Sequence, residues 1–155
     1  MPLTVLVADS DSWFRDLVWR VLEDTARVRE AGSPQEAVGL TRALWPDVAL
    51  LGIEMHLDDP GTIKRLKAAF PPMRVILMTG HGEEAYLNGT GKTGADAFLP
   101  KHRVRRELIQ TIRKLAGQAA RPWDGNDRRR PARVPRPTRY LGPNRRSLRT
   151  SRTPR

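Results

Sequence analysis

The sequence predicts an α/β fold, a doubly wound five-stranded parallel sheet of the flavodoxin-like kind, followed by a disordered tail. Short apolar runs of strand length alternate along residues 1–117 with stretches whose apolar residues recur at helical spacing. Strict alternation of strands and helices implies a parallel sheet with right-handed crossovers that cover both of its faces. Residues 118–155 show neither pattern and are dominated by arginine and proline.

The first and third expected strands, residues 3–8 and 48–51, are nearly continuous apolar runs that lack the alternation of a half-exposed strand. Such runs are typical of parallel strands buried on both faces. The expected strands are residues 3–8, 27–31, 48–51, 74–78 and 95–99.

The expected helices fill the segments between these strands. Ser33 is predicted to cap the second helix, with Pro34 at its first position and Pro46 beyond its end. A loop containing His56 should lead into the third helix. The fourth helix is weakened by two glycines, each of which costs about 1 kcal/mol relative to alanine. The helices are expected near residues 13–22, 34–45, 61–70, 82–93 and 104–117.

The net charge of +11 is concentrated at the end of the chain. Residues 118–155 hold 12 Arg, no Lys and two acids, whereas residues 1–117 hold 16 bases and 15 acids. High net charge with few apolar residues predicts disorder. We therefore expect one domain over residues 1–117 and a disordered, basic Arg/Pro-rich tail over residues 118–155.

Composition also narrows the class of protein. The absence of cysteine excludes disulfides and thiolate metal sites. The first residues lack the basic and long apolar regions of a signal peptide, and no apolar run approaches bilayer length. The expectation is a cytoplasmic protein without a membrane partner.

Polar residues follow the expected strands at their carboxyl ends, where open α/β sheets place their chemistry. Asp9 and Ser10 follow the first strand, and Glu54 lies just beyond the third. Thr79 follows the fourth strand and Lys101 the fifth.

Four segments of the chain are informative together: Val5–Asp9 (VLVAD), Pro46–Leu51 (PDVALL), Arg74–Gly80 (RVILMTG) and Gly94–Lys101 (GADAFLPK). The last segment is highly specific in its order and spacing. With these segments, about residues 3–116 of the chain resemble the receiver domains of two-component response regulators.

The resemblance implies a site that receives a phosphoryl group from a histidine kinase on an aspartate at the end of the third strand. Acids after the first strand help to hold Mg²⁺, and a hydroxyl and a lysine contact the phosphoryl oxygens. Asp9, Thr79 and Lys101 match the first acid, the hydroxyl and the lysine. Phe98 matches the aromatic residue that switches position in the family.

Two positions depart from the family pattern. Ser10 replaces the second acid, and Gly52 stands at the vacant phosphoacceptor position. The family can offer a backbone carbonyl at the position of Glu54 to the metal, but Asp9 and that carbonyl alone make a poor Mg²⁺ site. We therefore expect no cofactor and no enzymatic activity, and we hypothesise that Lys101 pairs directly with Asp9.

The resulting expectation is an atypical response regulator, a pseudo-receiver in phosphorelay signal transduction that acts by protein–protein contact without aspartyl phosphorylation. Its partner would be a histidine kinase or another regulator. The residues of the pocket are either relics or parts of a retained regulatory site.

The alternative is a nucleic-acid-associated protein that binds weakly and non-specifically through the tail. Its basic residues include Arg128, Arg129, Arg130, Arg145 and Arg146. The tail is either selected for binding or the translated remnant of a frameshift, and the sequence leaves both origins open.

Overall fold

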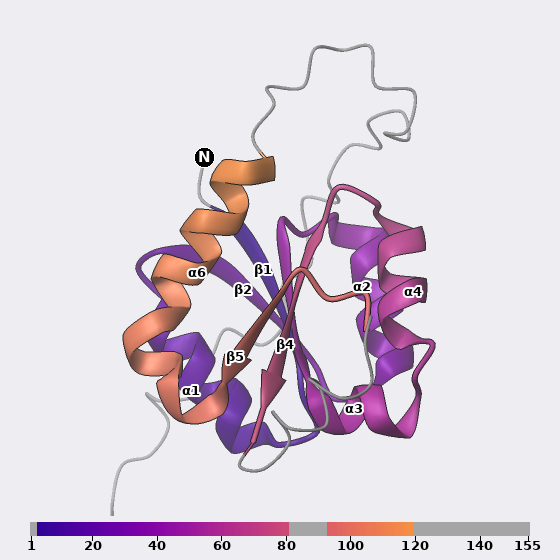
Figure 1. Ribbon diagram of the computed structural model, residues 1–155, viewed down its shortest axis with the longest axis horizontal. Coiled ribbons are helices and arrows are strands. Elements are labelled where there is room, and N and C mark those ends of the chain that lie inside the picture. Colours follow the sequence, from indigo (N-terminus) through magenta and orange to yellow (C-terminus); the bar gives the residue numbers. More distant parts are fainter. Residues whose placement is uncertain (1–2, 81–92, 120–155) are drawn as a thin grey trace, which may run out of the picture.

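The computed structural model describes residues 3–80 and 93–119, which form a twisted parallel sheet with helices on both faces (Figure 1). The strand order is β2-β1-β3-β4-β5, and every neighbouring pair is parallel. This order confirms the predicted fold class. The strands are β1 (Leu3–Ala8), β2 (Ala26–Ala31), β3 (Val48–Gly52), β4 (Arg74–Thr79) and β5 (Ala97–Pro100).

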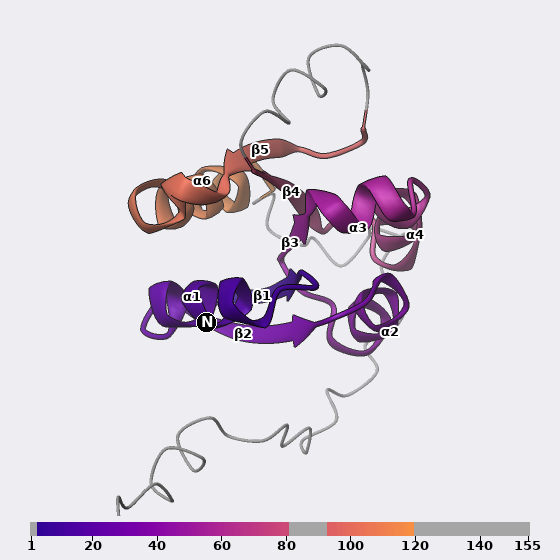
Figure 2. The ribbon, with the colours of Figure 1, turned by 90° about the horizontal axis from the view of Figure 1, so that it is seen from below.

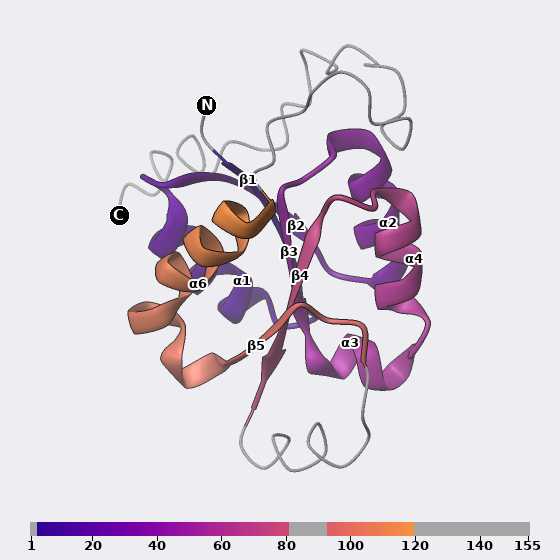
Figure 3. The same cartoon turned by 45° about the horizontal axis from the view of Figure 1, so that its top comes forward.

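The helices form one layer on each face of the sheet (Figures 2 and 3). One layer consists of α1 (Ser12–Leu22) and α6 (Val104–Ala119), and the other of α2 (Pro34–Leu44), α3 (Ile53–Asp58) and α4 (Thr62–Ala69). A short 3-10 helix, η1 (Lys101–Arg103), joins β5 to α6.

Two apolar cores result from this layering, one on each face of the sheet. Alternate residues of β1 serve both cores, with Val5 and Val7 in one cluster and Leu6 and Ala8 in the other. Side chains of successive strand residues point to opposite faces, so a strand buried on both faces must be apolar throughout. This requirement explains the continuous apolar runs of β1 and β3.

The ends of α2 follow the signals in the sequence. The Ser33 hydroxyl accepts a hydrogen bond from the Glu36 backbone N–H at 3.2 Å, and Pro34 occupies the first helical position. Trp45 ends the helix in the left-handed conformation, with φ 48°, and its ring stacks on that of Phe70 at 6.0 Å. The stacking offsets the conformational cost of placing a bulky residue there.

The expectation of a loop after β3 was wrong. Residues Ile53–Asp58 form α3, which begins directly after Gly52 and buries Ile53, Met55 and His56. Burial of these side chains outweighs the turn-forming residues that follow, so the local pattern alone was misleading.

The remaining differences from expectation are small. The third expected helix, residues 61–70, is α4, which spans Thr62–Ala69, and β5 begins at Ala97 instead of residue 95. Helix α6 reaches Ala119, two residues past the expected domain boundary. The expected helix at 82–93 falls almost entirely, and the tail arginines entirely, outside the described residues.

Asp96 fixes the entry into β5. Its carboxylate accepts hydrogen bonds from the Lys67 ammonium at 3.0 and 2.9 Å and from the Val75 backbone N–H at 2.8 Å. Arg74 adds an ion pair at 3.4 Å. These bonds tie α4, β4 and β5 together and hold β5 in register at the site-bearing end of the sheet.

No helix among the described residues is long and apolar enough to span a membrane.

Candidate functional site

The carboxyl ends of the strands bring together the residues that the sequence singled out. Asp9 follows β1, Gly52 ends β3, and Thr79 ends β4. Lys101 is the first residue of η1, directly after β5. In the view of Figure 1 this edge lies at the lower end of the sheet.

Lys101 is the centre of the site. Its Nζ lies 2.8 Å from Asp9 Oδ2 and 3.3 Å from Glu54 Oε1, and it also lies 4.7 Å from the centroid of the Phe14 ring. The Asp9 side chain is only 1% exposed, whereas that of Glu54 is 46% exposed. The hypothesised Asp9–Lys101 pair is thus present, with Glu54 as a second partner on the solvent side.

The charge state of Lys101 follows from these contacts. Burial acts on the Lys101 amine to lower its pKa, because it disfavours the charged form. The hydrogen bond and charge of Asp9, with those of Glu54, outweigh that effect and raise the pKa above its ordinary value. Lys101 is therefore a permanent cation whose charge is already neutralised inside the protein.

Asp9 is held from three sides. Its Oδ1 accepts a hydrogen bond from the Asp11 backbone N–H at 2.9 Å, and its backbone carbonyl accepts one from Arg15 Nη1 at 2.6 Å. Arg15 in turn lies 3.4 Å from Glu30 on β2. The carboxylate of Asp9 therefore has a fixed direction, toward Lys101.

Gly52, at the vacant phosphoacceptor position, is closely surrounded by the side chains of its neighbours. A Cβ atom built on Gly52 would overlap Asp9 Oδ2 and would lie 2.8 Å from Asp9 Cγ and 3.0 Å from Glu54 Oε2. Position 52 lacks a nucleophile, and the space that a side chain would need there is filled by its neighbours.

The other predicted site residues lie at different depths. Thr79 is 1% exposed, and its hydroxyl has no hydrogen-bond partner among the described residues. Ser10 is exposed on the loop before α1. Phe98 is 48% exposed on β5 and is not part of the Asp9–Lys101 cluster.

The residues of the pocket do not fit a magnesium ion. Among the described residues, Asp9 and Glu54 are the carboxylates in contact with Lys101, whose ammonium lies 2.8 and 3.3 Å from them. A divalent cation placed between them would meet a positive charge in its own coordination shell. Oxygen ligands from several sides are what Mg²⁺ requires, and neither Ser10 nor Gly52 supplies a carboxylate.

The structure also corrects the expectation that His56 lies in a loop. His56 lies on α3, is 8% exposed, and its Nδ1 has no hydrogen-bond partner among the described residues. Burial lowers the pKa of its imidazole, because the charged form loses its hydration.

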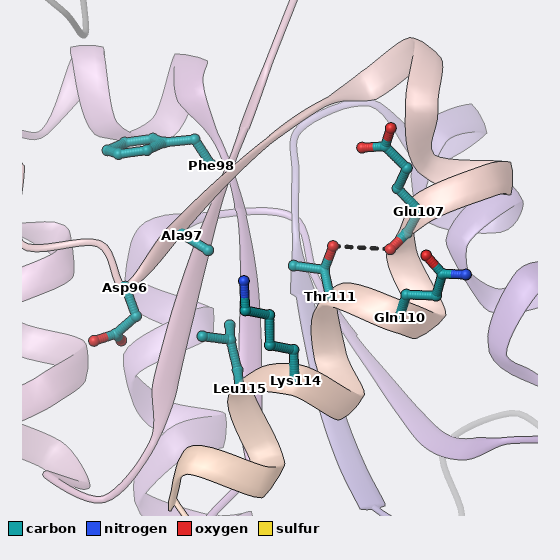
Figure 4. A pocket seen from close by; sticks show the side chains of 8 residues that line it. All are labelled: Asp96, Ala97, Phe98, Glu107, Gln110, Thr111, Lys114 and Leu115. Carbon is teal, nitrogen blue, oxygen red and sulfur yellow. Dashed lines mark hydrogen bonds between the residues drawn. The ribbon is translucent and has the colours of Figure 1, made fainter.

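A separate cavity of about 500 Å³ lies between β5 and α6 (Figure 4). Phe98 and Ala97 line it on the side of β5, and charged and polar side chains of α6, including Glu107 and Lys114, line it on the other side. The Phe98 ring itself points away from the α6 side chains (Figure 4). A hydrogen bond of 2.8 Å from the Thr111 hydroxyl to the Glu107 carbonyl lies on the helix itself.

Reasoning from the sequence missed the partners that surround Lys101. Phe14 was not considered as a neighbour of Lys101, and Glu54 was considered only for the metal, not as a partner of Lys101. A signal for Glu54 was available: a carboxylate at the second position after β3 lies on the first turn of α3, which begins at the same edge as Lys101. The overlooked helix concealed that signal.

The comparisons with known proteins agree with this geometry. The sequence profile of the response regulator receiver domain matches residues 5–113. A protein-glutamate methylesterase/protein-glutamine glutaminase of Idiomarina loihiensis is 34% identical over 123 residues, which cover 72% of this chain and 32% of that protein. The probable transcriptional regulatory protein NarL of Mycobacterium tuberculosis is 31% identical, over 70% of this chain and 52% of its own length.

Solved structures show the same fold. A receiver domain protein from Clostridium thermocellum has a TM-score of 0.66 and 26% identity, over 75% of this chain and 95% of that structure. A CheY-like receiver domain protein from Methanospirillum hungatei has a TM-score of 0.67 and 21% identity, over 77% and 97%. The chain spans only about a third to a half of the curated relatives cited above. The chain belongs to the response regulator receiver domain family of two-component signalling.

Proposed function

We propose that this protein is a receiver that signals by contact with a histidine kinase or another regulator and is not switched by aspartyl phosphorylation. The observation that carries the proposal is Gly52, which offers no nucleophile at the end of β3, where receivers of this family carry their acceptor aspartate. Asp9, the nearest carboxylate, is 1% exposed and paired with Lys101.

The contacts of Lys101 support the same conclusion, because they determine whether its charge can stabilise a phosphoryl group. A lysine that stabilises a transferred phosphoryl group must direct its charge toward that group. Here Nζ is shared between Asp9 at 2.8 Å and Glu54 at 3.3 Å. The charge of Lys101 is thus paired within the fold, and Gly52 provides no nucleophile at the acceptor position. We propose that the domain has no catalytic role of its own.

The surface between β5 and α6 is the proposed contact site. It includes Phe98 on β5, whose side chain is 48% exposed and points away from α6, and the cavity that Glu107 and Lys114 line on the α6 side of the strand (Figure 4). An aromatic anchor with a polar surround is the usual composition of an interface centre. Because the Asp9–Lys101 pair holds the receiver pocket in one arrangement, the β5–α6 surface should have the same conformation with and without a phosphodonor.

The experiment is a binding series with a panel of purified histidine kinases, measured with and without acetyl phosphate and Mg²⁺. We expect equal affinity in both conditions and at least about tenfold weaker binding for Phe98→Ala, as for an interface anchor. Leu57→Ala is the matched control, since Leu57 is 43% exposed on α3. Affinity that rises with the phosphodonor, or equal losses for both variants, would contradict the proposal.

A second candidate function is binding of nucleic acid, favoured by the distribution of charge. Residues 101–155 hold 18 bases and three acids, whereas residues 1–100 hold 10 bases and 14 acids. Part of this excess lies on the folded domain, where Arg106, Arg113 and Lys114 are exposed on α6. The basic surface would therefore continue from the tail onto α6, and arginine suits phosphate because it can bind in a bidentate manner.

This candidate is tested by the anisotropy of a labelled DNA duplex over a salt series. The full chain should bind with an affinity that falls steeply with salt, by a slope of about 0.9 per phosphate contacted. Deletion of residues 120–155 should remove most of that slope, and Arg106→Ala with Arg113→Ala should reduce it further. Binding that survives the deletion unchanged would exclude the tail as the binding element.

A further inference from the structure

We infer that the Asp9 carboxylate is an internal occupant of the acceptor position, which takes the place of a side chain at residue 52 and keeps Lys101 engaged. The inference deepens the proposed function and rests on it for its biological meaning. It adds a physical claim of its own: position 52 and Asp9 compete for one space. Besides the partly exposed Glu54, the site can then hold one buried carboxylate next to Lys101, carried by residue 9 or residue 52.

The competition follows from the distances around Gly52. The Cβ of any side chain at position 52 would overlap Asp9 Oδ2 and would lie 2.8 Å from Asp9 Cγ. Real Cβ atoms essentially never approach other atoms so closely. Gly52 itself has φ −63° and ψ 137°, an extended conformation that any residue can adopt. The obstacle at position 52 is therefore the Asp9 side chain and not the backbone.

Asp9 cannot leave this space without losing bonds. Its Oδ1 accepts the Asp11 N–H at 2.9 Å, its Oδ2 faces Lys101 Nζ at 2.8 Å, and its side chain is 1% exposed. A rotation away from Gly52 would give up these contacts in a place that water scarcely reaches. A buried carboxylate without its partners is strongly disfavoured.

A second carboxylate at position 52 would add like-charge repulsion to the overlap. Asp9 and Glu54 already lie on either side of the space, and Lys101 is the cation they share. Carboxylates at short range disfavour each other's ionised form. Gly52→Asp alone should thus destabilise the fold, whereas moving the carboxylate from residue 9 to residue 52 should preserve the pair with Lys101.

The experiment measures the melting temperatures of the full-length chain and of five variants. They are Gly52→Ala, Gly52→Asp, Asp9→Ala, the double variant Asp9→Ala/Gly52→Asp, and Gly39→Ala as the control. Gly39 lies in α2, and a Cβ there would meet no atom within 4 Å. Alanine also has the higher helix propensity, so the control should melt at or slightly above the unmodified chain.

The inference predicts that Gly52→Ala, Gly52→Asp and Asp9→Ala each melt about 5 °C or more below the unmodified chain, a substantial shift for a domain of this size. The double variant should return to within about 3 °C of it, because the carboxylate introduced at position 52 then replaces that of Asp9 beside Lys101. Gly52→Ala melting no lower than Gly39→Ala would overturn the inference. So would a double variant that melts lower than Asp9→Ala.

These outcomes separate the inference from the proposed function. If Gly52→Ala is harmless and the unmodified chain still takes up no phosphate, the internal occupant is disproved and the unphosphorylated receiver stands. If the unmodified chain is phosphorylated, the proposed function fails whatever the melting temperatures show.

Discussion

Lys101 Nζ lies 2.8 Å from Asp9 Oδ2, although their strands β5 and β1 are separated in the sheet by β3 and β4. The contact spans the end of β3, where Gly52 carries no side chain. The missing side chain thus permits an ion pair that a side chain at position 52 would obstruct. The glycine at position 52 and the Asp9–Lys101 pair are therefore linked by geometry in this structure.

Replacing Lys101 by alanine should destabilise the domain. The change removes the ion-pair partner of the Asp9 carboxylate, which is 1% exposed. We expect a loss of roughly 2–3 kcal/mol in the free energy of unfolding. This is below the about 3–5 kcal/mol for fully buried pairs, because Lys101 is 20% exposed. Urea unfolding followed by circular dichroism measures the loss, with Lys114→Ala as the exposed-lysine control. A loss equal to that of the control would show that the pair contributes nothing.

Magnesium should leave the stability of the protein unchanged. A ligand stabilises the native state by RT ln(1 + [L]/Kd), so a site with Kd above about 10 mM yields less than ~0.1 kcal/mol at about 1 mM Mg²⁺. The physical reason is that Asp9 and Glu54 already share the Lys101 ammonium. Melting curves over a MgCl₂ series measure the effect, with CaCl₂ as a control for ionic strength. A clear rise in melting temperature at millimolar Mg²⁺ alone would show that a metal site persists.

The stability of the protein should fall as the pH decreases below about 6.5. Burial lowers the pKa of His56 in the folded state below its ordinary value of 6.5, so the unfolded chain takes up the proton first. The contribution of His56 to the free energy of unfolding is therefore fully present above pH 6.5. It is lost as the pH falls from there toward the folded pKa, by at most about 1.4 kcal/mol per pH unit.

Urea unfolding at pH values between 7 and 5 measures this loss. His56→Gln should flatten the pH dependence, whereas His102→Gln, on the exposed surface of η1, should leave it in place. A pH dependence that is identical in the two variants would assign the effect to another group.

Asp96→Ala should cost stability at neutral pH and remove part of the acid sensitivity. The variant loses the hydrogen bonds to Lys67 and to the Val75 N–H, a loss of roughly 2–3 kcal/mol for a half-buried charged group. Although burial acts in the opposite direction, the Val75 and Lys67 hydrogen bonds and nearby charges lower the Asp96 pKa below 3.8. Its contribution is thus present above pH 3.8 and is lost as the pH falls through the folded pKa. Unfolding curves between pH 7 and 2 measure both the loss of stability at neutral pH and the reduced acid sensitivity of Asp96→Ala, with the exposed Asp24→Ala as the control.

The layers of the fold could be predicted from the sequence because the signals for strands and helix ends are local. Buried parallel strands require continuous apolar runs, and the capping of α2 by Ser33 and Pro34 is written in adjacent residues. The pairing of Asp9 with Lys101 was also accessible, because the carboxyl ends of parallel strands lie at one edge of the sheet.

Side-chain directions and tertiary packing could not be predicted from the sequence in the same way. Trp19 and Trp13 both lie on α1, yet Trp19 packs against the core and Trp13 is 86% exposed. A long side chain at the flank of a helix can reach back to the core. Likewise, Gly52 indicated a missing acceptor but not that Asp9 fills the space, since that depends on a rotamer set by Lys101 and Asp11.

The proposal that this receiver is not phosphorylated is tested by incubating the unmodified chain with acetyl phosphate and Mg²⁺ and measuring its intact mass. A receiver that keeps an aspartate at the acceptor position serves as the positive control in the same reaction. The account predicts a phosphate adduct on the control and none on this chain, because Gly52 has no nucleophile and Asp9 is buried against Lys101. An adduct of one phosphoryl group on this chain would contradict the account.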